Sequence, residues 1–347
     1  MIETEGFVAV IKDVAKLAGL SVSAVSKYLN HPDHVKEDTK MRIEAAIREL
    51  NYVPSATARS MRTKRSNMIA VVVPDILDVF YTEVFNSIKY YAQLKGYTPI
   101  LYTIENDFEV LRDYLKKISV NQFDGLMLCF LDEDELREFY HKFESEVPVV
   151  MFSGEITNNR FSAVATDVFH GGYMATKHLI DCGCRRIAYV GGMENSKTTK
   201  EKHAGYRKAL QEAGLAANPD YSYYGQYRFE TGYDAAKAFY CMEEMPDGIF
   251  AANDVVAMGF MKCMMNKGVK IPEDVKVIGF DNVRISSMYQ PGISTIMLPV
   301  NDMCMQAVDM LTNAIEKKDE QKHTKIFKNE LIIRDSTDKN SVTEYEK

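Results

Sequence analysis

The residues between Val10 and Arg65 carry charges that set them apart from the rest of the chain. Eleven lysines and arginines stand in this segment against six aspartates and glutamates, whereas the whole chain of 347 residues has a formal net charge of −7. A local excess of cations attracts phosphates and is typical of a segment that binds nucleic acid. The sequence therefore predicts a small basic head that binds nucleic acid, followed by a large acidic body.

Residues that could catalyse a reaction or hold a metal do not occur at the required spacings. The six cysteines form no CxxC pair, and Cys182, Cys184 and His178 are poorly spaced for a tetrahedral zinc site. No phosphate-binding GK[ST] loop, GxSxG motif or HExxH motif is present. We therefore expect reduced cysteines, no metal, no cofactor and no enzymatic activity.

Length and composition are those of a folded protein with several domains. Hydrophobic residues make up 46% of the chain and charged residues 26%, which is typical of globular proteins, and the length allows two or three domains. No apolar run reaches the length of a membrane span, and the N-terminus lacks the order of a secretory signal. We expect a cytoplasmic protein with no membrane contact.

Three short helices are needed to position the basic residues. Helical periodicity predicts a helix over 13–18 that ends at Gly19, and Ser21 is suited to cap a second helix over 22–29. A third helix, over about 38–50, has apolar residues at the spacing of one buried face. The first two helices are separated by about three residues, so we predict a helix-turn-helix domain at residues 9–54.

A hinge and linker follow at residues 55–67. Pro54 ends the head, and Ser55 can cap a helix of about eight residues. An isolated helix of this length is marginal in water. We expect the hinge helix to fold only when something else holds it.

From Met68 onward, apolar strand patterns alternate with helical patterns. We predict strands at 69–73, 98–102, 125–129, 147–152, 186–190, 248–251 and 275–280, and helices at 81–95, 171–181, 202–213, 231–242 and 255–267. This alternation is typical of parallel sheets covered by helices on both faces. About 270 residues favour two doubly wound subdomains with a ligand cleft between them. The predicted bounds are 68–165 with 297–329, and 166–296 with 330–336, followed by a disordered tail at 337–347.

Both regions resemble the lactose-repressor (LacI/GalR) family of bacterial transcription regulators. The head matches at Ile11 to Lys16, Ala18 to Ser21, Val25 to Lys27, Leu29-Asn30 and Leu50 to Pro54. The body matches at Asp124 to Leu126, Gly171-Gly172, Ala204 to Tyr206, Phe250 to Asp254 and Val277 to Asn282. The resemblance implies a homodimer that binds a palindromic operator in double-stranded DNA and a small-molecule effector in a core like that of periplasmic binding proteins.

The resemblance also implies which residues contact DNA. In helix-turn-helix proteins the second helix enters the major groove, which directs Val22, Ser23 and Lys27 toward base edges. Phosphate contacts are expected from Lys12, Ser21, Ser26 and Asn30. In the hinge, which enters the minor groove in the family, the expected contacts are Ser55, Arg59, Met61 and Arg62. Met61 stands where leucine usually wedges into a base step, and its alternative is a plain linker residue.

The effector site is expected where apolar strands end. Asp281 can accept hydrogen bonds from two ligand hydroxyls or from a ring N–H, or it can instead cap the turn that follows. Phe80 and Tyr81 match family positions that sandwich the ligand, or they belong to the core. Lys202 stands where relatives place an arginine, and lysine keeps the charge but not the bidentate geometry. The expected ligand residues are Phe80, Tyr81, Phe130, Thr198, Lys202, Tyr227, Asn253 and Asp281, with Asp254 as a helix cap.

Acidic, amide and aromatic groups favour a sugar or a similar hydroxylated metabolite as the effector. A purine-like corepressor and control by a protein partner are the alternatives within the family. A stand-alone solute-binding protein is the alternative from another class, but it leaves the basic head unexplained. Helices near Tyr81–Lys95 and Val255–Lys267 are candidates for the dimer interface.

Overall fold

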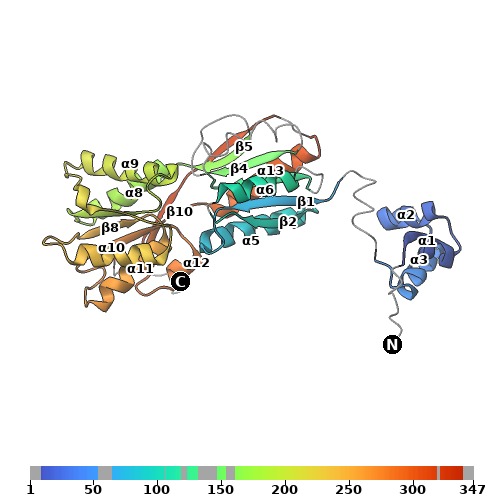
Figure 1. The fold of residues 1–347 in the computed structure, drawn as a ribbon, viewed down its shortest axis with the longest axis horizontal. Coiled ribbons are helices and arrows are strands. Elements are labelled where there is room, and N and C mark those ends of the chain that lie inside the picture. Colours follow the sequence, from blue (N-terminus) through green and yellow to red (C-terminus); the bar gives the residue numbers. More distant parts are fainter. Residues whose placement is uncertain are drawn as a thin grey trace. The chain divides into compact units, whose positions relative to one another are not determined.

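The chain consists of two units, residues 1–66 and 67–347, and each is described separately (Figure 1). The structure is a computed structural model and describes residues 9–53, 65–105, 107–118, 123–131, 147–153, 161–318 and 321–338. No helix within these ranges is long and apolar enough to cross a membrane. Of the hinge and linker predicted at 55–67, residues 55–64 lie outside the described residues.

The head is a bundle of three helices around a small apolar core. Its helices are α1 (Ile11–Ala18), α2 (Val22–Asn30) and α3 (Glu37–Glu49). Val14, Val25 and Ile43, one from each helix, are fully buried. Gly19 has a left-handed φ of 62° and ends α1, and the Ser21 hydroxyl accepts a hydrogen bond from the Ala24 N–H at 3.1 Å. The predicted helix-turn-helix is therefore confirmed.

The body contains two lobes, each built on a six-stranded sheet (Figure 1). In the N-lobe the strand order is β11-β5-β4-β3-β1-β2, and every pairing is parallel. The strands are β1 (Met68–Val73), β2 (Thr98–Thr103), β3 (Gly125–Cys129), β4 (Val149–Ser153), β5 (Ser162–Thr166) and β11 (Thr324–Phe327). The N-lobe helices are α5 (Val79–Leu94), α6 (Phe108–Ile118) and α13 (Val300–Ile315).

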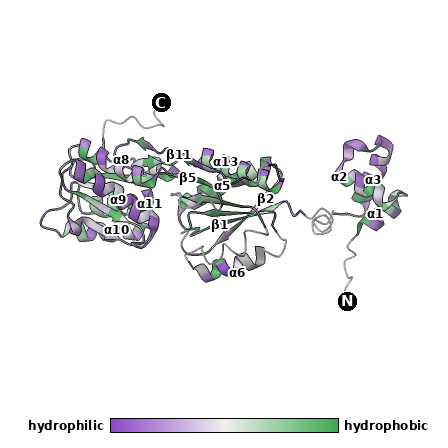
Figure 2. Ribbon diagram, turned by 90° about the horizontal axis from the view of Figure 1, so that it is seen from above, coloured by the Kyte–Doolittle hydropathy of each residue, from purple (hydrophilic) through white to green (hydrophobic). Residues whose placement is uncertain are grey.

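The C-lobe repeats this plan with the order β12-β10-β9-β8-β6-β7. Its strands are β6 (Ile187–Gly191), β7 (Ser222–Tyr224), β8 (Gly248–Ala251), β9 (Lys276–Asp281), β10 (Ser294–Met297) and the antiparallel β12 (Glu330–Ile332). Its helices are α8 (Val168–Asp181), α9 (Lys197–Glu212), α10 (Phe229–Tyr240), α11 (Asp254–Asn266) and α12 (Arg284–Met288). Figure 2 shows helices of both units carrying hydrophilic and hydrophobic residues side by side, as expected of helices with one face on an apolar core.

All seven predicted strands of the body exist, so the prediction of two doubly wound parallel sheets is confirmed. The sequence missed short strands such as β7 and β12, and it missed α13, which packs on α5 and on the N-lobe sheet. The predicted disordered tail begins too early. Ser336 and Thr337 are buried, and the Thr337 hydroxyl lies 2.8 Å from Nε2 of the buried His178. Polar composition misled the prediction because these hydroxyls find partners inside the C-lobe.

Glycines let the outer helices of the C-lobe cross at very short distance. A Cβ atom added at Gly232 of α10 would lie 1.9 Å from the Val256 carbonyl oxygen of α11. Gly259 of α11 has the same relation to the Phe229 carbonyl oxygen. Because both obstacles are backbone atoms, neither can rotate out of the way.

We therefore expect Gly232→Ala to lower the free energy of unfolding by about 3 kcal/mol, the upper range for overpacking. Gly214→Ala is the control, because a Cβ there meets nothing within 4 Å and adds only left-handed strain at φ +69°. Urea unfolding of both variants measures the difference. Equal losses would show that α10 and α11 can move apart without cost.

Candidate functional site

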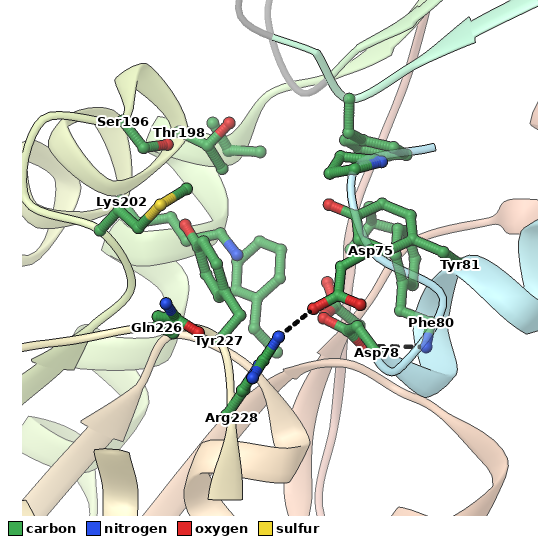
Figure 3. A pocket seen from close by; sticks show the side chains of 17 residues that line it. Asp75, Asp78, Phe80, Tyr81, Ser196, Thr198, Lys202, Gln226, Tyr227 and Arg228 are labelled. Carbon is green, nitrogen blue, oxygen red and sulfur yellow. Dashed lines mark hydrogen bonds and ion pairs between the residues drawn. The ribbon is translucent and has the colours of Figure 1, made fainter. Parts of the chain in front are cut away.

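A cavity that is partly open to solvent lies between the two lobes (Figure 3). It is lined by Pro74, Asp75, Asp78, Phe80, Tyr81, Phe130, Val168, Met193, Ser196, Thr198, Lys202, Gln226, Tyr227, Arg228, Phe280, Asp281 and Leu298. The set combines aromatic rings, three carboxylates, two cations and several neutral polar groups. A mostly enclosed space with a few convergent polar groups is the usual form of a small-molecule site.

Aromatic rings form the N-lobe wall. Phe80 and Tyr81 lie in the first turn of α5, and the Asp78 carboxylate caps this helix by accepting from the Phe80 N–H at 3.0 Å. Phe130 follows β3 with a φ of 54°, a left-handed conformation that is uncommon for a bulky residue. The ring centroids of Phe80 and Phe130 are 5.1 Å apart in an edge-to-face arrangement. These rings can stack on a sugar face or on a planar ligand.

Lys202 lies in the C-lobe wall, where its ammonium group already has partners. The side chain is 3% exposed, and Nζ donates to the Ala252 carbonyl oxygen at 2.8 Å. Nζ also lies 3.7 Å from the ring centroid of Phe280 and 5.6 Å from that of Tyr227, within cation–π range. Burial lowers the pKa of Lys202, whereas the charges of Asp281 and Asp78 act in the opposite direction.

Asp281 ends β9 in a strained conformation. Its φ is 97°, and the next residue, Asn282, has a φ of 57°. The Asn282 amide oxygen accepts from Arg334 at 2.7 Å, and the Asn282 N–H donates to the Thr295 hydroxyl at 3.3 Å. Backbone strain of this kind persists only when the surroundings hold it, and it concentrates at functional sites. The strained backbone lowers the stability of the folded state, and it places the Asp281 carboxylate in the wall of the cavity.

The carboxylates of the cavity are held in an environment that disfavours their charge. Burial raises the pKa of Asp281 to about 7; the nearby charges of Asp78 and Glu83 add to this effect, and that of Lys202 opposes it. Burial likewise raises the pKa of Asp78 to about 6, although the Phe80 N–H and the Lys202 charge oppose the shift. The nearby cation and hydrogen-bond donors therefore offset only part of the effect of burial on these two carboxylates.

Three polar contacts join the lobes beside the cavity. Arg228 of the C-lobe pairs with Asp75 of the N-lobe at 2.7 Å (Figure 3). The Arg284 N–H donates to the Glu83 carboxylate at 2.8 Å. The third contact, at 3.3 Å, runs from the Asn253 amide to Asp78. A ligand in the cavity thus lies next to the groups that hold the lobes together.

Seven of the eight predicted ligand residues line the cavity, and Asn253 does not. Asn253 is 2% exposed and lies behind the wall, where its side chain caps α11 by accepting from the Val256 N–H at 2.8 Å. The expectation that Asp254 caps this helix was therefore wrong. Asp254 is fully buried and accepts from the Val283 N–H and the Thr295 hydroxyl, so it supports the loop after β9.

Several residues that line the cavity were not predicted from the sequence. The residues added by the structure include Asp75, Asp78, Ser196, Gln226 and Arg228. Asp75 and Asp78 follow β1 just as Asp281 ends β9, so the rule that ligand sites collect at carboxyl ends of parallel strands could have found them. Ser196, Gln226 and Arg228 lie in loops without a comparable pattern.

A second candidate surface lies on the head. Val22, Ser23 and Lys27 are exposed on α2, and Lys12 is exposed on α1. Ser21 serves as the cap of α2, and Ser26 is partly buried. The side chain of Asn30 and the residues Ser55, Arg59, Met61 and Arg62 lie outside the described part of the structure.

Metal chemistry finds no support in the described residues. Within them no three His, Cys, Asp or Glu side chains are grouped to hold an ion. All six cysteines are free thiols, and Cys129, Cys184, Cys263 and Cys304 are buried.

The two units match known families separately. Residues 10–55 match the bacterial regulatory proteins of the lacI family, and residues 176–337 match the periplasmic binding protein-like domain. The fold and cavity together define a DNA-binding regulator with a small-molecule-binding core.

Similar proteins agree over nearly the whole chain. The transcriptional repressor PurR of Vibrio campbellii is 33% identical over 332 residues, which cover 95% of this chain and 99% of that protein. PurR of Haemophilus influenzae is 34% identical over the same length. The chain therefore belongs to the lacI family of bacterial regulatory proteins and is a DNA-binding transcriptional regulator.

Solved structures with the same fold include regulators bound to ligands. The complex of the transcriptional regulator CelR with cellobiose superposes with a TM-score of 0.70 at 25% identity, covering 94% of this chain and 99% of CelR. The lac repressor dimer bound to operator and the anti-inducer ONPF superposes with a TM-score of 0.84 at 22% identity, covering 95% and 99% of the two chains.

The raised pKa of Asp281 predicts a pH-dependent stability. In the unfolded chain the pKa of an aspartate is about 4, whereas in the folded chain the pKa of Asp281 is about 7. Between these values the folded chain binds more protons, so its stability falls as the pH rises. Asp281→Asn removes this titration, and we expect the variant to gain stability over the native protein as the pH increases from 5 to 8.

Denaturant unfolding at several pH values measures this effect. Glu243→Gln is the control: Glu243 is exposed in the turn before β8, and β8 begins at the opposite end of the C-lobe sheet from Asp281, so this variant removes one charge far from the cavity. A stability difference between Asp281→Asn and the native protein that stays constant with pH would contradict the electrostatic description of the site.

Proposed function

We propose that the protein is a homodimeric, effector-responsive repressor that binds a palindromic operator and takes a small metabolite into the cavity between its lobes. The observation that carries the proposal is this cavity, with its aromatic and acidic walls, in a chain that also contains a helix-turn-helix head. The relatives named as repressors support it. Such a protein meets its operator in the cytoplasm, and we propose no catalytic role for it.

The proposed DNA-reading surface is the exposed side of α2. Val22 offers methyl groups to thymine, Ser23 can donate or accept, and Lys27 reaches guanine as a point charge. Lys12, Ser21, Ser26 and Asn30 are proposed to hold phosphates and to set the register. In the hinge we propose contacts from Ser55, Arg59 and Arg62, with Met61 as the wedge in the minor groove.

The proposed effector is a sugar or a similar hydroxylated metabolite. Asp281 and Asp78 can accept hydrogen bonds from ligand hydroxyls, and Phe80, Tyr81 and Phe130 can pack on an apolar ligand face. Relatives bound to cellobiose and to ribose support this class. The identity to PurR favours a purine-like corepressor as the second candidate. A planar base would fit the aromatic wall, but it would have to find hydrogen-bond donors elsewhere than Lys202.

The proposed coupling runs through elements that touch both the cavity and the rest of the molecule. β1 begins at Met68, directly after the linker, and ends at the cavity wall. α5 begins at the cavity and exposes Tyr90 and Leu94, which are 60% and 68% accessible, toward its other end. We propose that this end of α5 belongs to the dimer interface, together with α11. A ligand that shifts the lobes then changes the spacing of the two hinges in the dimer.

Because the hinge helix is too short to be stable alone, its spacing on DNA decides whether it folds. A ligand that prefers the lobe arrangement of the DNA-bound state acts as a corepressor, and one that prefers the other arrangement acts as an inducer. Both act through the same contacts.

Lys27→Ala tests the proposed reading of bases. If Lys27 contacts a base edge, the variant should lose roughly 1–3 kcal/mol of specific binding and should lose preference at one base position. Selection of duplexes from a random pool by native and variant protein gives both quantities. An equal loss on every sequence would show that Lys27 contacts only phosphate.

Asp281→Ala tests the proposed effector site. The expected result is that metabolites which change operator affinity of the native protein no longer do so, while the variant still binds the operator. Fluorescence anisotropy with labelled operator measures both properties, and metabolite binding should also raise the native unfolding midpoint by mass action. A regulator controlled by a protein partner would show no such response to any metabolite, and a stand-alone solute-binding protein would show no operator preference.

A further inference from the structure

The charges of the cavity do not balance. Its lining contains Asp75, Asp78 and Asp281 against Lys202 and Arg228. Asp75 and Arg228 neutralise each other at the rim, at 2.7 Å. Lys202 is then left with two carboxylates, and the interior has one negative charge in excess when both are ionised.

Lys202 does not compensate either carboxylate by direct contact. Its ammonium donates to the Ala252 carbonyl oxygen and lies on the Phe280 ring. Within the described residues, no lysine or arginine side chain is at ion-pair distance from Asp78 or Asp281. The lysine is oriented by the C-lobe backbone, and the space between the carboxylates is left to the ligand.

Asp78 and Asp281 also differ in the number of hydrogen bonds that their carboxylates accept. Asp78 accepts from the Phe80 N–H and from the Asn253 amide. Asp281 has no hydrogen-bond donor among the described residues, although its backbone is strained to present it. An ionised carboxylate only accepts, so the group that binds here must donate. A group that also carries positive charge would correct the imbalance.

We propose that the effector carries a protonated primary amino group and that Asp78 of the N-lobe and Asp281 of the C-lobe hold this group between them. The inference rests on the proposed effector site and names its ligand class, of which an amino sugar is the simplest member. The sugar ring packs on Phe80, Tyr81 and Phe130, whose π faces also attract a cation. Asp78 becomes the residue that selects an amine over a hydroxyl.

The matched neutral ligands fit less well. A hexose donates hydrogen bonds through its hydroxyls but leaves the excess negative charge without a cation, which is costly for carboxylates that are largely removed from water. An N-acetylated sugar has lost the charge and adds bulk. An ammonium group satisfies both carboxylates by charge-assisted hydrogen bonds, which are about twice as strong as neutral ones.

The protonation of the carboxylates adds a pH dependence to amine binding. The groups that face Asp281 are Asp78 and Glu83 from the N-lobe, Lys202 from α9 and the buried Asp254 from α11. Burial raises the pKa of Asp281 to about 7 and that of Asp78 to about 6. Amine affinity should therefore rise from pH 5 to pH 7, where both carboxylates become available and the amine is still protonated.

The test uses calorimetric titration of the full-length protein with matched probes. The pairs are glucosamine with glucose, galactosamine with galactose and mannosamine with mannose, and N-acetylglucosamine is the neutral amide. We expect one amine to bind about 10- to 100-fold more tightly than its hydroxyl partner. Asp78→Asn should reduce this preference by at least about tenfold, because it removes the charge but keeps the shape.

Glu83→Gln is the matched control, because it removes one charge near Asp281 from outside the cavity lining and keeps an acceptor for the Arg284 N–H. This variant should keep the amine preference. A loss of preference equal to that of Asp78→Asn would show that general charge, and not contact with Asp78, selects the ligand, and would overturn the proposal.

The remaining outcomes separate this inference from the proposed effector site. Binding of a hexose as tight as that of its amine, or tighter, overturns the amine assignment and leaves the cavity as an effector site. If none of the amino sugars binds, the amine assignment is overturned as well. If the hexoses do not bind either, and none of the probes changes the operator affinity, the proposal of a sugar effector is overturned together with the amine assignment.

Discussion

The enclosure of charge between two lobes is the physical constraint on which this molecule depends. Asp78 and Asp281 come from different lobes, so moving the lobes together places both carboxylates in a space of low polarity. Burial there raises the pKa of both carboxylates, because a space of low polarity disfavours their charged form. A ligand that satisfies these groups therefore stabilises one arrangement of the lobes over another. Binding and lobe arrangement are linked because the same charges take part in both.

The topology explains why these groups meet. Apart from the antiparallel β12, the strands of both lobes are parallel, and the residues at or just after the carboxyl ends of β1, β3 and β9 converge on the cavity. Phe130 and Asp281 leave their strands with positive φ values of 54° and 97°. Residues behind the cavity wall hold the strained loop after β9. Arg334 donates a hydrogen bond to Asn282, and the buried Asp254 accepts hydrogen bonds from Thr295 and from the Val283 N–H. The chain after β12 thus takes part in shaping the site although it does not line the cavity.

The sequence predicted the fold well because the pattern of buried strands and amphipathic helices is strong. It predicted those ligand residues that follow apolar strands, such as Asp281, and those that match family positions. It failed where a side chain has two possible partners. Asn253 follows β8 and was expected to contact the ligand, yet it caps α11 and donates a hydrogen bond to Asp78. No local pattern distinguishes these roles, since both need an amide at a strand end. Short edge strands such as β7 and β12 carry too few residues for a periodic signal.

Communication with DNA requires that a small change in the body decide the state of the hinge. Polar contacts join the lobes beside the cavity, next to an apolar cluster that contains buried residues of both lobes, and the partly exposed pair of Arg228 with Asp75 contributes little alone. Small contributions suit a switch, because a ligand can shift an equilibrium only by the difference in its affinity for the two states. The hinge helix that we propose would suit a switch in the same way, because an isolated helix of about eight residues is marginal in water. If the hinge folds only on the operator, as we propose, the binding energy of one metabolite is enough to change its state.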